Sequence, residues 1–174
     1  MPPPPLPEDV LARVRRIARY NGASVLVVAG FFALLQGAAH DFTMAMLCLA
    51  AAGAGAAERH GAARLGAGDP AGVRWLVGSQ LYLLLVIDAY ALFRVLQYDP
   101  ALIQRALQVM LETPMMRIRM EESGMTEADL FGLVRVSYFL VYAILALVTL
   151  AYQGGLAFYY HRRRPAILRA IAGE

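Results

Sequence analysis

The sequence predicts an all-α integral membrane protein with four transmembrane helices. Hydrophobic residues make up 59% of the 174 residues and charged residues only 17%, whereas a soluble domain has about 45–50% apolar and about 25% charged residues. Four apolar stretches also approach the roughly 20 residues that an α-helix needs to cross a bilayer. A chain of this length fits one domain, so we expect residues 1–174 to form a single four-helix transmembrane domain.

The region before the first span has an amphipathic pattern. Met1–Pro7 is rich in proline and should be extended. In Glu8–Tyr20, four arginines occupy one part of the helix surface and apolar residues share the other face. The apolar residues are Val10, Leu11, Val14, Ile17 and Ala18. This pattern predicts a helix that lies on an anionic inner leaflet. A solvated helix docked on the bundle is the alternative.

The predicted spans cover about residues 22–40, 41–58, 74–95 and 130–160. The first resembles a signal peptide in its arginine-rich lead and its small residues Gly37–Ala39, but we interpret it as a span. The second is short and consists largely of small residues between Asp41 and Glu58, including Gly53 and Gly55. Faces of small residues allow two helix backbones to approach closely. We therefore expect a helix–helix contact there, inside the chain or between copies.

A segment of about residues 98–128 joins the third and fourth spans and should form an extracytoplasmic helical region. Asp99 is a predicted N-cap, Pro100 fits the first helical position, and Pro114 should end this helix. The helix is too apolar to stand in water, so we expect it to contact the membrane interface, the bundle or a partner. Met116–Met120 alternates as a short strand would.

The fourth span belongs to the longest predicted helix. Thr126 and Asp129 resemble a capping box, which places the start of this helix near Glu127. Gly154 and Gly155 are adjacent inside it, and each glycine costs about 1 kcal/mol relative to alanine in a helix. The pair therefore predicts a kink or a close approach by another helix.

The placement of arginine predicts the orientation. All 16 basic residues are arginine, and eleven of them lie on the side of the membrane that would hold both termini. Cytoplasmic loops carry the excess of basic residues. We therefore expect a multi-pass protein of a bacterial-type cytoplasmic (inner) membrane, with the N- and C-termini in the cytoplasm.

Asp88 lies within the third span and is the main candidate for chemistry. A carboxylate in a membrane span is costly unless it is paired, protonated or facing water. Gln80 lies on the same half of the helix, Gln36 could join a polar path from the first span, and Arg135 could approach Asp88 from the fourth. In the functional interpretation, Asp88 is a protonatable or ion-binding residue of this path. In the structural interpretation, Asp88 is neutralised by Arg135, or it is protonated and holds the bundle together through a hydrogen bond.

Other chemistry receives little support from the sequence. The absence of lysine excludes a P-loop and a Schiff base. There is no G-x-S-x-G elbow and no H-E-x-x-H motif. We expect no catalytic residue, no bound metal and no cofactor. The net charge of +3 is too small to indicate nucleic-acid binding.

Three functions remain open from the sequence. The first is a small oligomeric channel or transporter-like protein with a polar path near Asp88. The second is a non-catalytic accessory or scaffolding subunit of a larger membrane complex. The third is a membrane enzyme that acts on a lipid or quinone. The expected partners are the lipid bilayer and either further copies of the chain or other membrane subunits.

Overall fold

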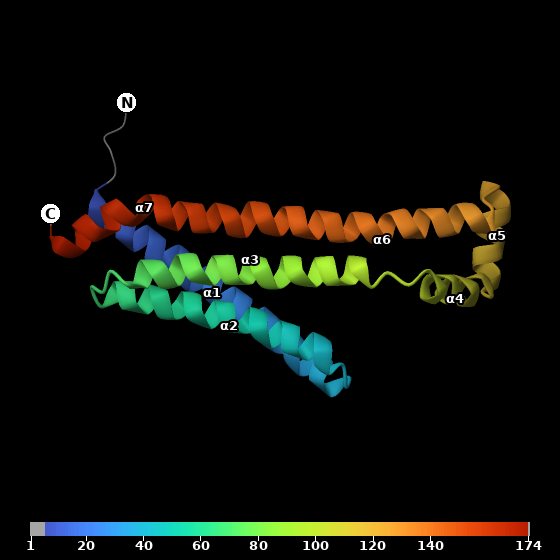
Figure 1. Ribbon diagram of the computed structural model, residues 1–174, viewed down its shortest axis with the longest axis horizontal. Helices are drawn as coiled ribbons and strands as arrows, with labels where there is room; N and C mark the ends of the chain where they lie inside the picture. The colour runs from blue at the N-terminus through green and yellow to red at the C-terminus, as the bar shows by residue number, and fades with distance from the viewer. Residues whose placement is uncertain (1–5, 174) are drawn as a thin grey trace, which may run out of the picture. The chain divides into compact units, whose positions relative to one another are not determined.

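The computed structural model describes residues 6–173, and these residues form helices joined by short turns, with no strand among them (Figure 1). The elements are α1 (Pro7–Ala38), α2 (Phe42–Gly66), α3 (Gly72–Leu96), α4 (Pro100–Leu111), α5 (Pro114–Ser123), α6 (Glu127–Thr149), the π-helix η1 (Leu150–Gly154) and α7 (Gly155–Ala172). They divide into two compact units. The first contains the residues up to Ala89 and from Val148 onward, and the second is Tyr90–Leu147.

Three helical stretches are long and apolar enough to cross a membrane. They are Pro7–Ala38, Gly72–Leu96 and the continuous stretch Glu127–Ala172. The predicted second span is absent from this group because α2 carries Glu58, Arg59 and Arg64 in its last third. The all-helical fold is thus confirmed, and three of its helical stretches are long and apolar enough to span a membrane.

The expectation of a separate helix at Glu8–Tyr20 is wrong, because α1 runs without interruption from Pro7 to Ala38. Its first half does not lie apart from the bundle. Val14 and Ala18 are fully buried, and they pack in one hydrophobic cluster with residues of α2, α3 and α7. The burial of this apolar face agrees with the alternative of a helix docked on the bundle.

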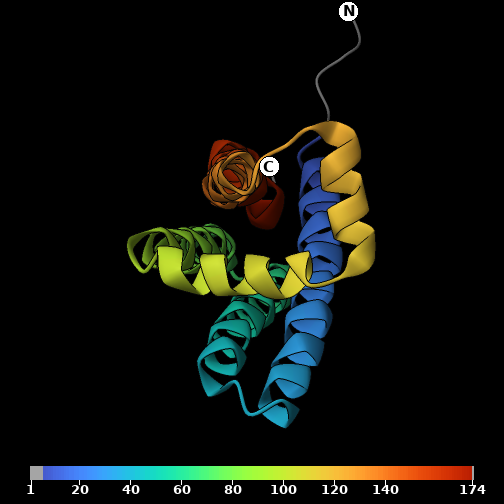
Figure 2. The same ribbon diagram turned by 90° about the vertical axis from the view of Figure 1, so that its right-hand side faces the viewer.

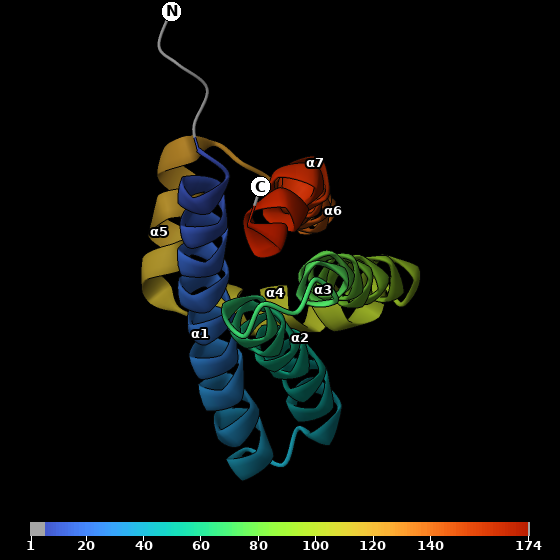
Figure 3. The same cartoon turned by 90° about the vertical axis from the view of Figure 1, so that its left-hand side faces the viewer.

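The core of the first unit lies where α1, α2, α3 and α7 come together (Figure 3). It consists of Val10, Val14, Ala18, Ala62, Leu65, Val73, Leu76, Tyr160 and Ile167. Tyr160 and Ile167 of α7 are fully buried there, although they lie about 100 residues after α2 in the sequence. This long-range packing joins α7 to the N-terminal helices.

Glycines allow α2 to lie very close to α1 and to α3. A Cβ atom added at Gly55 would lie 2.6 Å from the backbone nitrogen of Leu26, and one added at Gly22 would lie 2.8 Å from the carbonyl oxygen of Gly55. Gly61 and Gly72 make a similar contact between α2 and α3, because a Cβ at Gly72 would lie 2.6 Å from the Gly61 carbonyl oxygen. Backbone-to-backbone crossings of this kind are made by small residues in membrane helices.

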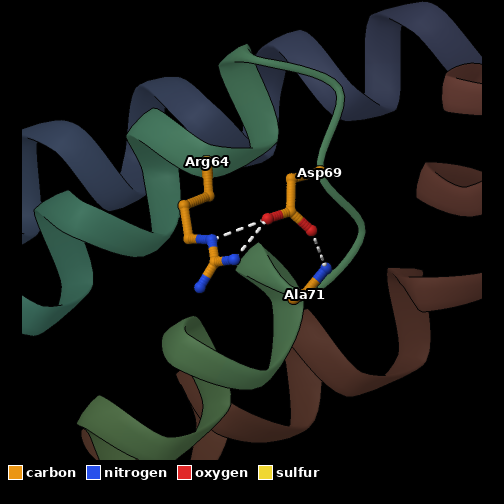
Figure 4. Close-up of polar contacts among 3 residues, drawn as sticks. All are labelled: Arg64, Asp69 and Ala71. Carbon is orange, nitrogen blue, oxygen red and sulfur yellow. Dashed lines mark hydrogen bonds and ion pairs between the residues drawn. The ribbon is translucent and has the colours of Figure 1, made fainter.

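The loop between α2 and α3 is fixed by Asp69 (Figure 4). The Arg64 guanidinium donates through Nε to Asp69 Oδ2 at 2.7 Å, and the Ala71 backbone N–H donates to Oδ1 at 2.8 Å. The Ala71 N–H, followed by the Arg64 guanidinium, holds the pKa of the Asp69 carboxyl below its ordinary value. Gly68 has a φ of 79°, a left-handed conformation that glycine adopts without strain.

In the second unit, the caps predicted from the sequence are present. Asp99 accepts a hydrogen bond from the Ala101 N–H, and Pro100 is the first residue of α4. Thr126 and Asp129 form the reciprocal bonds of a capping box, and α6 begins at Glu127. α4 and α5 run in clearly different directions (Figure 2).

The strand-like alternation of Met116–Met120 does not lead to a strand, because these residues belong to α5. Pro114 at the start of α5 sets a backbone φ that suits a helix. A strand needs a neighbouring strand for its backbone hydrogen bonds, and residues 6–173 offer none. A helix satisfies these groups within its own segment.

Candidate polar site around Glu58

Glu58 lies inside the first unit, and its side chain is almost completely enclosed. It is 1% exposed, although it is an acid on a helix rich in alanine and glycine. The Asn21 side-chain amide donates to Glu58 Oε2 at 2.7 Å, and the Tyr160 hydroxyl donates to Oε1 at 2.8 Å. Each carboxylate oxygen therefore has a neutral donor that comes from a different helix.

Two further polar side chains extend this cluster. The side chain of Gln80, 1% exposed on α3, also interacts with the Glu58 carboxylate. The Tyr152 hydroxyl donates to Asn21 Oδ1 at 3.0 Å. We call Asn21, Glu58, Gln80, Tyr152 and Tyr160 the Glu58 cluster. Its residues come from α1, α2, α3, η1 and α7, so the cluster exists only in the assembled bundle.

The backbone contacts of the first unit explain why these side chains meet. Asn21 directly precedes Gly22, and Glu58 lies one helical turn after Gly55. The close crossing of Gly22 and Gly55 therefore brings the amide and the carboxylate within bonding distance. Gly154 is the last residue of the π-helix Leu150–Gly154, and Gly155 is the first residue of α7. A π-turn changes the register of the side chains on either side of it. Tyr152 lies within this π-helix and Tyr160 follows it on α7, and both side chains belong to the Glu58 cluster.

The electrostatics of Glu58 are unusual for a buried acid. In the part of the chain that the structure describes, the ion pair present is Arg64–Asp69, and no basic side chain lies within ion-pair distance of Glu58. An ionised carboxylate without a cation is costly to bury. Tyrosine can donate a hydrogen bond to an ionised carboxylate and accept one from a protonated carboxyl. The cluster can therefore hydrogen-bond Glu58 in either state.

Several acceptor oxygens in the first unit have no partner. Gln80 Oε1, Asp88 Oδ1 and Gln153 Oε1 are buried, and none of them has a hydrogen-bond donor among the described residues. Gln80 and Gln153 are themselves buried residues. Buried polar atoms are normally satisfied by protein or by water. These oxygens are suited to accept a hydrogen bond from water or from a protonated species.

The predicted path residues occupy separate places. Gln80 belongs to the Glu58 cluster, and Asp88 follows it on α3 by about two turns, or about 12 Å. Gln36 is half-buried and lies about 22 Å along α1 from Asn21. Arg135 is exposed in the second unit, whereas Asp88 belongs to the first, so pairing between these two residues stays a prediction.

The glycines selected from the sequence also differ in their surroundings. Gly55 lies in the tight contact with α1, and its partner Gly22 was not singled out by the sequence pattern. Nothing lies within 4 Å of a Cβ added at Gly53, Gly154 or Gly155. Contacts of these three with a neighbouring helix would therefore have to come from outside the described chain.

The second unit contains an aromatic group of its own. The Tyr138 hydroxyl donates to the carbonyl oxygen of Arg94 at 2.7 Å, and Arg94 Nε donates to the Tyr142 hydroxyl at 3.1 Å. The ring of Tyr98 contacts Tyr138, with 5.2 Å between the ring centroids. These contacts connect the end of α3 to α6 and explain the two tyrosines as packing residues.

The sequence predicts Glu58 as the end of a short span, whereas the structure shows that its side chain is buried. A signal for its burial exists in the spacing. Gly55, Glu58, Ala62 and Leu65 recur at intervals of three and four residues, which places them on one face of a helix that continues past Glu58. All four are buried.

Comparison of the chain with protein families, with curated proteins and with solved structures finds no match.

Proposed function

We propose that the chain is a small helical membrane transport protein with a proton-linked path, in which Glu58 is the residue that binds and releases the proton. The observation that carries this proposal is the buried Glu58 carboxyl, which is hydrogen-bonded by Asn21 and Tyr160 and has no cationic partner among the described residues. Ionisable groups within membrane bundles commonly mark proton relays and ion pathways.

The unpaired acceptors extend the proposed path. Gln80 lies beside Glu58, and Asp88 lies further along the same helix with a buried, unpartnered oxygen. Water between these oxygens would connect Glu58 to Asp88. In this proposal Asp88 is a second proton-binding residue of the path, and Gln36 belongs to a more distant part of it within the first unit.

The proposed topology has four spans, with α2 crossing the membrane beside α1. α2 contains 25 residues, about 37 Å of helix, and the tight packing of Gly55 against α1 supports its place in the bundle. The excess of arginine in the predicted inner loops supports cytoplasmic termini. Single cysteines placed at Tyr20 and at Tyr98 in a Cys48→Ala background test this: position 20 should react only from the cytoplasm, and position 98 only from the opposite side.

A flux assay tests the function. The purified chain is placed in vesicles that contain a pH-sensitive dye, and a potassium diffusion potential drives proton entry. Wild type should acidify the vesicles, and Glu58→Gln should remove most of this flux. Glu112→Gln, at an exposed acid that directly follows α4, should leave it unchanged. Flux through Glu58→Gln at the wild-type rate, or no flux through wild type, would contradict the proposal.

Self-association is part of this proposal. A hollow of about 500 Å³ lies between α2 and α3 and is lined by Gly53, Gly78 and Ser79, with the rings of Trp75 and Tyr82 beside them. Small residues that line an open hollow suit the close packing of another membrane helix. Gly53→Cys in a Cys48→Ala background should crosslink two copies under oxidation, and a purely monomeric product would argue against this contact.

The accessory-subunit function is the second candidate, and it is supported by α4. Leu107 of this helix is buried, but Val109 is 66% exposed and Met110 is 53% exposed. Exposed apolar residues outside the spans suit contact with a partner. Purification from native membranes with a defined set of other membrane chains, in the absence of proton flux by the isolated chain, would favour this candidate.

A further inference from the structure

A second feature of the first unit is a basic hollow of about 480 Å³ on α1 and α2. Four arginines line it: Arg15, Arg16 and Arg19 of α1, and Arg59 of α2. Tyr20 completes the lining together with small alanine side chains, and no acidic residue is part of it. The hollow therefore gathers positive charge from two helices in one place.

These arginines have no carboxylate partner among the residues that the structure describes, where the ion pair present is Arg64–Asp69. Arg15 Nε is buried without any hydrogen-bond acceptor. A buried guanidinium nitrogen without an acceptor is costly. The hollow is thus electrostatically and sterically suited to an anion with several acceptor oxygens.

Two glycines lie against arginines that line the hollow. A Cβ added at Gly66 would lie 2.5 Å from Arg15 Nη2, so a side chain at residue 66 would displace the end of the Arg15 side chain. A Cβ added at Gly22 would lie 3.0 Å from Arg59 Cγ, so the stem of Arg59 rests on α1 at this glycine. The arginines are therefore held by the packing of α1 against α2.

We propose that this hollow binds the phosphate group of an anionic phospholipid. Guanidinium groups bind phosphate through paired hydrogen bonds. The exposed apolar surface of α1 begins within two turns of the hollow: Val27 is 66% exposed, and Phe31 is 57% exposed. A lipid with its phosphate among the arginines could lay its acyl chains along this surface. Tyr20, exposed at the edge of the hollow, suits the membrane interface.

The experiment counts the lipids retained on the purified chain by native mass spectrometry, during titration with phosphatidylglycerol or phosphatidylcholine. Wild type should retain phosphatidylglycerol at one saturable site and show no such site for phosphatidylcholine. The variant Arg16→Gln/Arg59→Gln should lower the affinity of this site for phosphatidylglycerol by about thirtyfold. This factor corresponds to a loss of about 1 kcal/mol of binding free energy for each arginine. Both side chains are exposed, so the variant should fold.

The matched control is Arg13→Gln/Arg162→Gln, which removes the same charge outside the hollow. Its loss should be much smaller than that of the hollow pair. Equal losses for both pairs would show that the general surface potential holds the lipid, and would overturn the proposal. Pyrophosphate is the soluble competitor. If pyrophosphate occupies the site and phosphatidylglycerol does not, the source of the phosphate is not a lipid and the proposal fails.

Discussion

Replacement of Glu58 by leucine tests whether the polar cluster is a connected network. The substitution removes the acceptor of two hydrogen bonds, from Asn21 Nδ2 and from the Tyr160 hydroxyl. A buried donor left without an acceptor costs about 1–3 kcal/mol, so the two together cost about 4 kcal/mol. Burial of the leucine side chain returns about 2 kcal/mol. We expect Glu58→Leu to lower the free energy of unfolding by about 2 kcal/mol.

The triple variant Glu58→Leu/Asn21→Leu/Tyr160→Phe provides the matched comparison. It removes the acceptor and both donors, so no donor of these two bonds is left unsatisfied. Joint replacement of hydrogen-bonded partners by apolar side chains is often neutral or stabilising. Gln80 and Tyr152 are the members of the Glu58 cluster that stay polar in this variant. We therefore expect the triple variant to be more stable than Glu58→Leu and close to wild type.

The assay is reversible unfolding of the purified chain in mixed micelles with increasing denaturing detergent, followed by helical circular dichroism. All variants are measured in the same detergent, because free energies of unfolding can be compared only when the conditions are identical. A Glu58→Leu variant that is more stable than wild type would contradict a connected network. So would a triple variant that is less stable than Glu58→Leu.

Three further predictions concern other parts of the chain. Gly55→Ala should lower the free energy of unfolding by about 1–3 kcal/mol, because its Cβ would meet backbone atoms of α1. Its control is Gly30→Ala, because nothing lies within 4 Å of a Cβ added at Gly30. Gly30→Ala should be neutral or stabilising in the same assay. Wild type should be more stable than Asp69→Asn at a pH well above 3.8, the ordinary pKa of the Asp69 carboxyl. This difference in stability should vanish as the pH falls through the lowered pKa of the folded state. A difference that does not change with pH would argue against an ionised Asp69 that fixes the loop. Thr126→Ala should weaken the first turn of α6 by about 0.5–2 kcal/mol, which hydrogen exchange of that turn would detect, and unchanged exchange would disprove the role of the cap.

Local features were the most predictable from the sequence. The cap at Asp99, the proline at the start of α4 and the capping box at Thr126 depend on residues within one helical turn, and all are present. The third predicted span also agrees with α3 within a few residues. The continuous α1 was missed because the change from an amphipathic to an apolar pattern near Tyr20 does not itself interrupt a helix.

The candidate site was much harder to predict. Asp88 attracted attention because an acid within an apolar run is visible in the sequence alone. Glu58 lies beside arginine and histidine, in a pattern typical of an exposed helix end. Its burial depends on packing by α1 and α7, and no local pattern reveals which helix will cover a given face.

The sequence by itself determined the helical, membrane-type character of the chain and the positions of its helix caps, because composition and interactions within one turn are sufficient for both. Only the tertiary structure decided which polar residues meet. Asn21, Glu58 and Tyr160 are joined because glycines allow α1 and α2 to cross closely and because the fully buried Tyr160 anchors α7 against them. These contacts link residues 37 and 102 positions apart, and their pairing depends on how the helices pack in three dimensions.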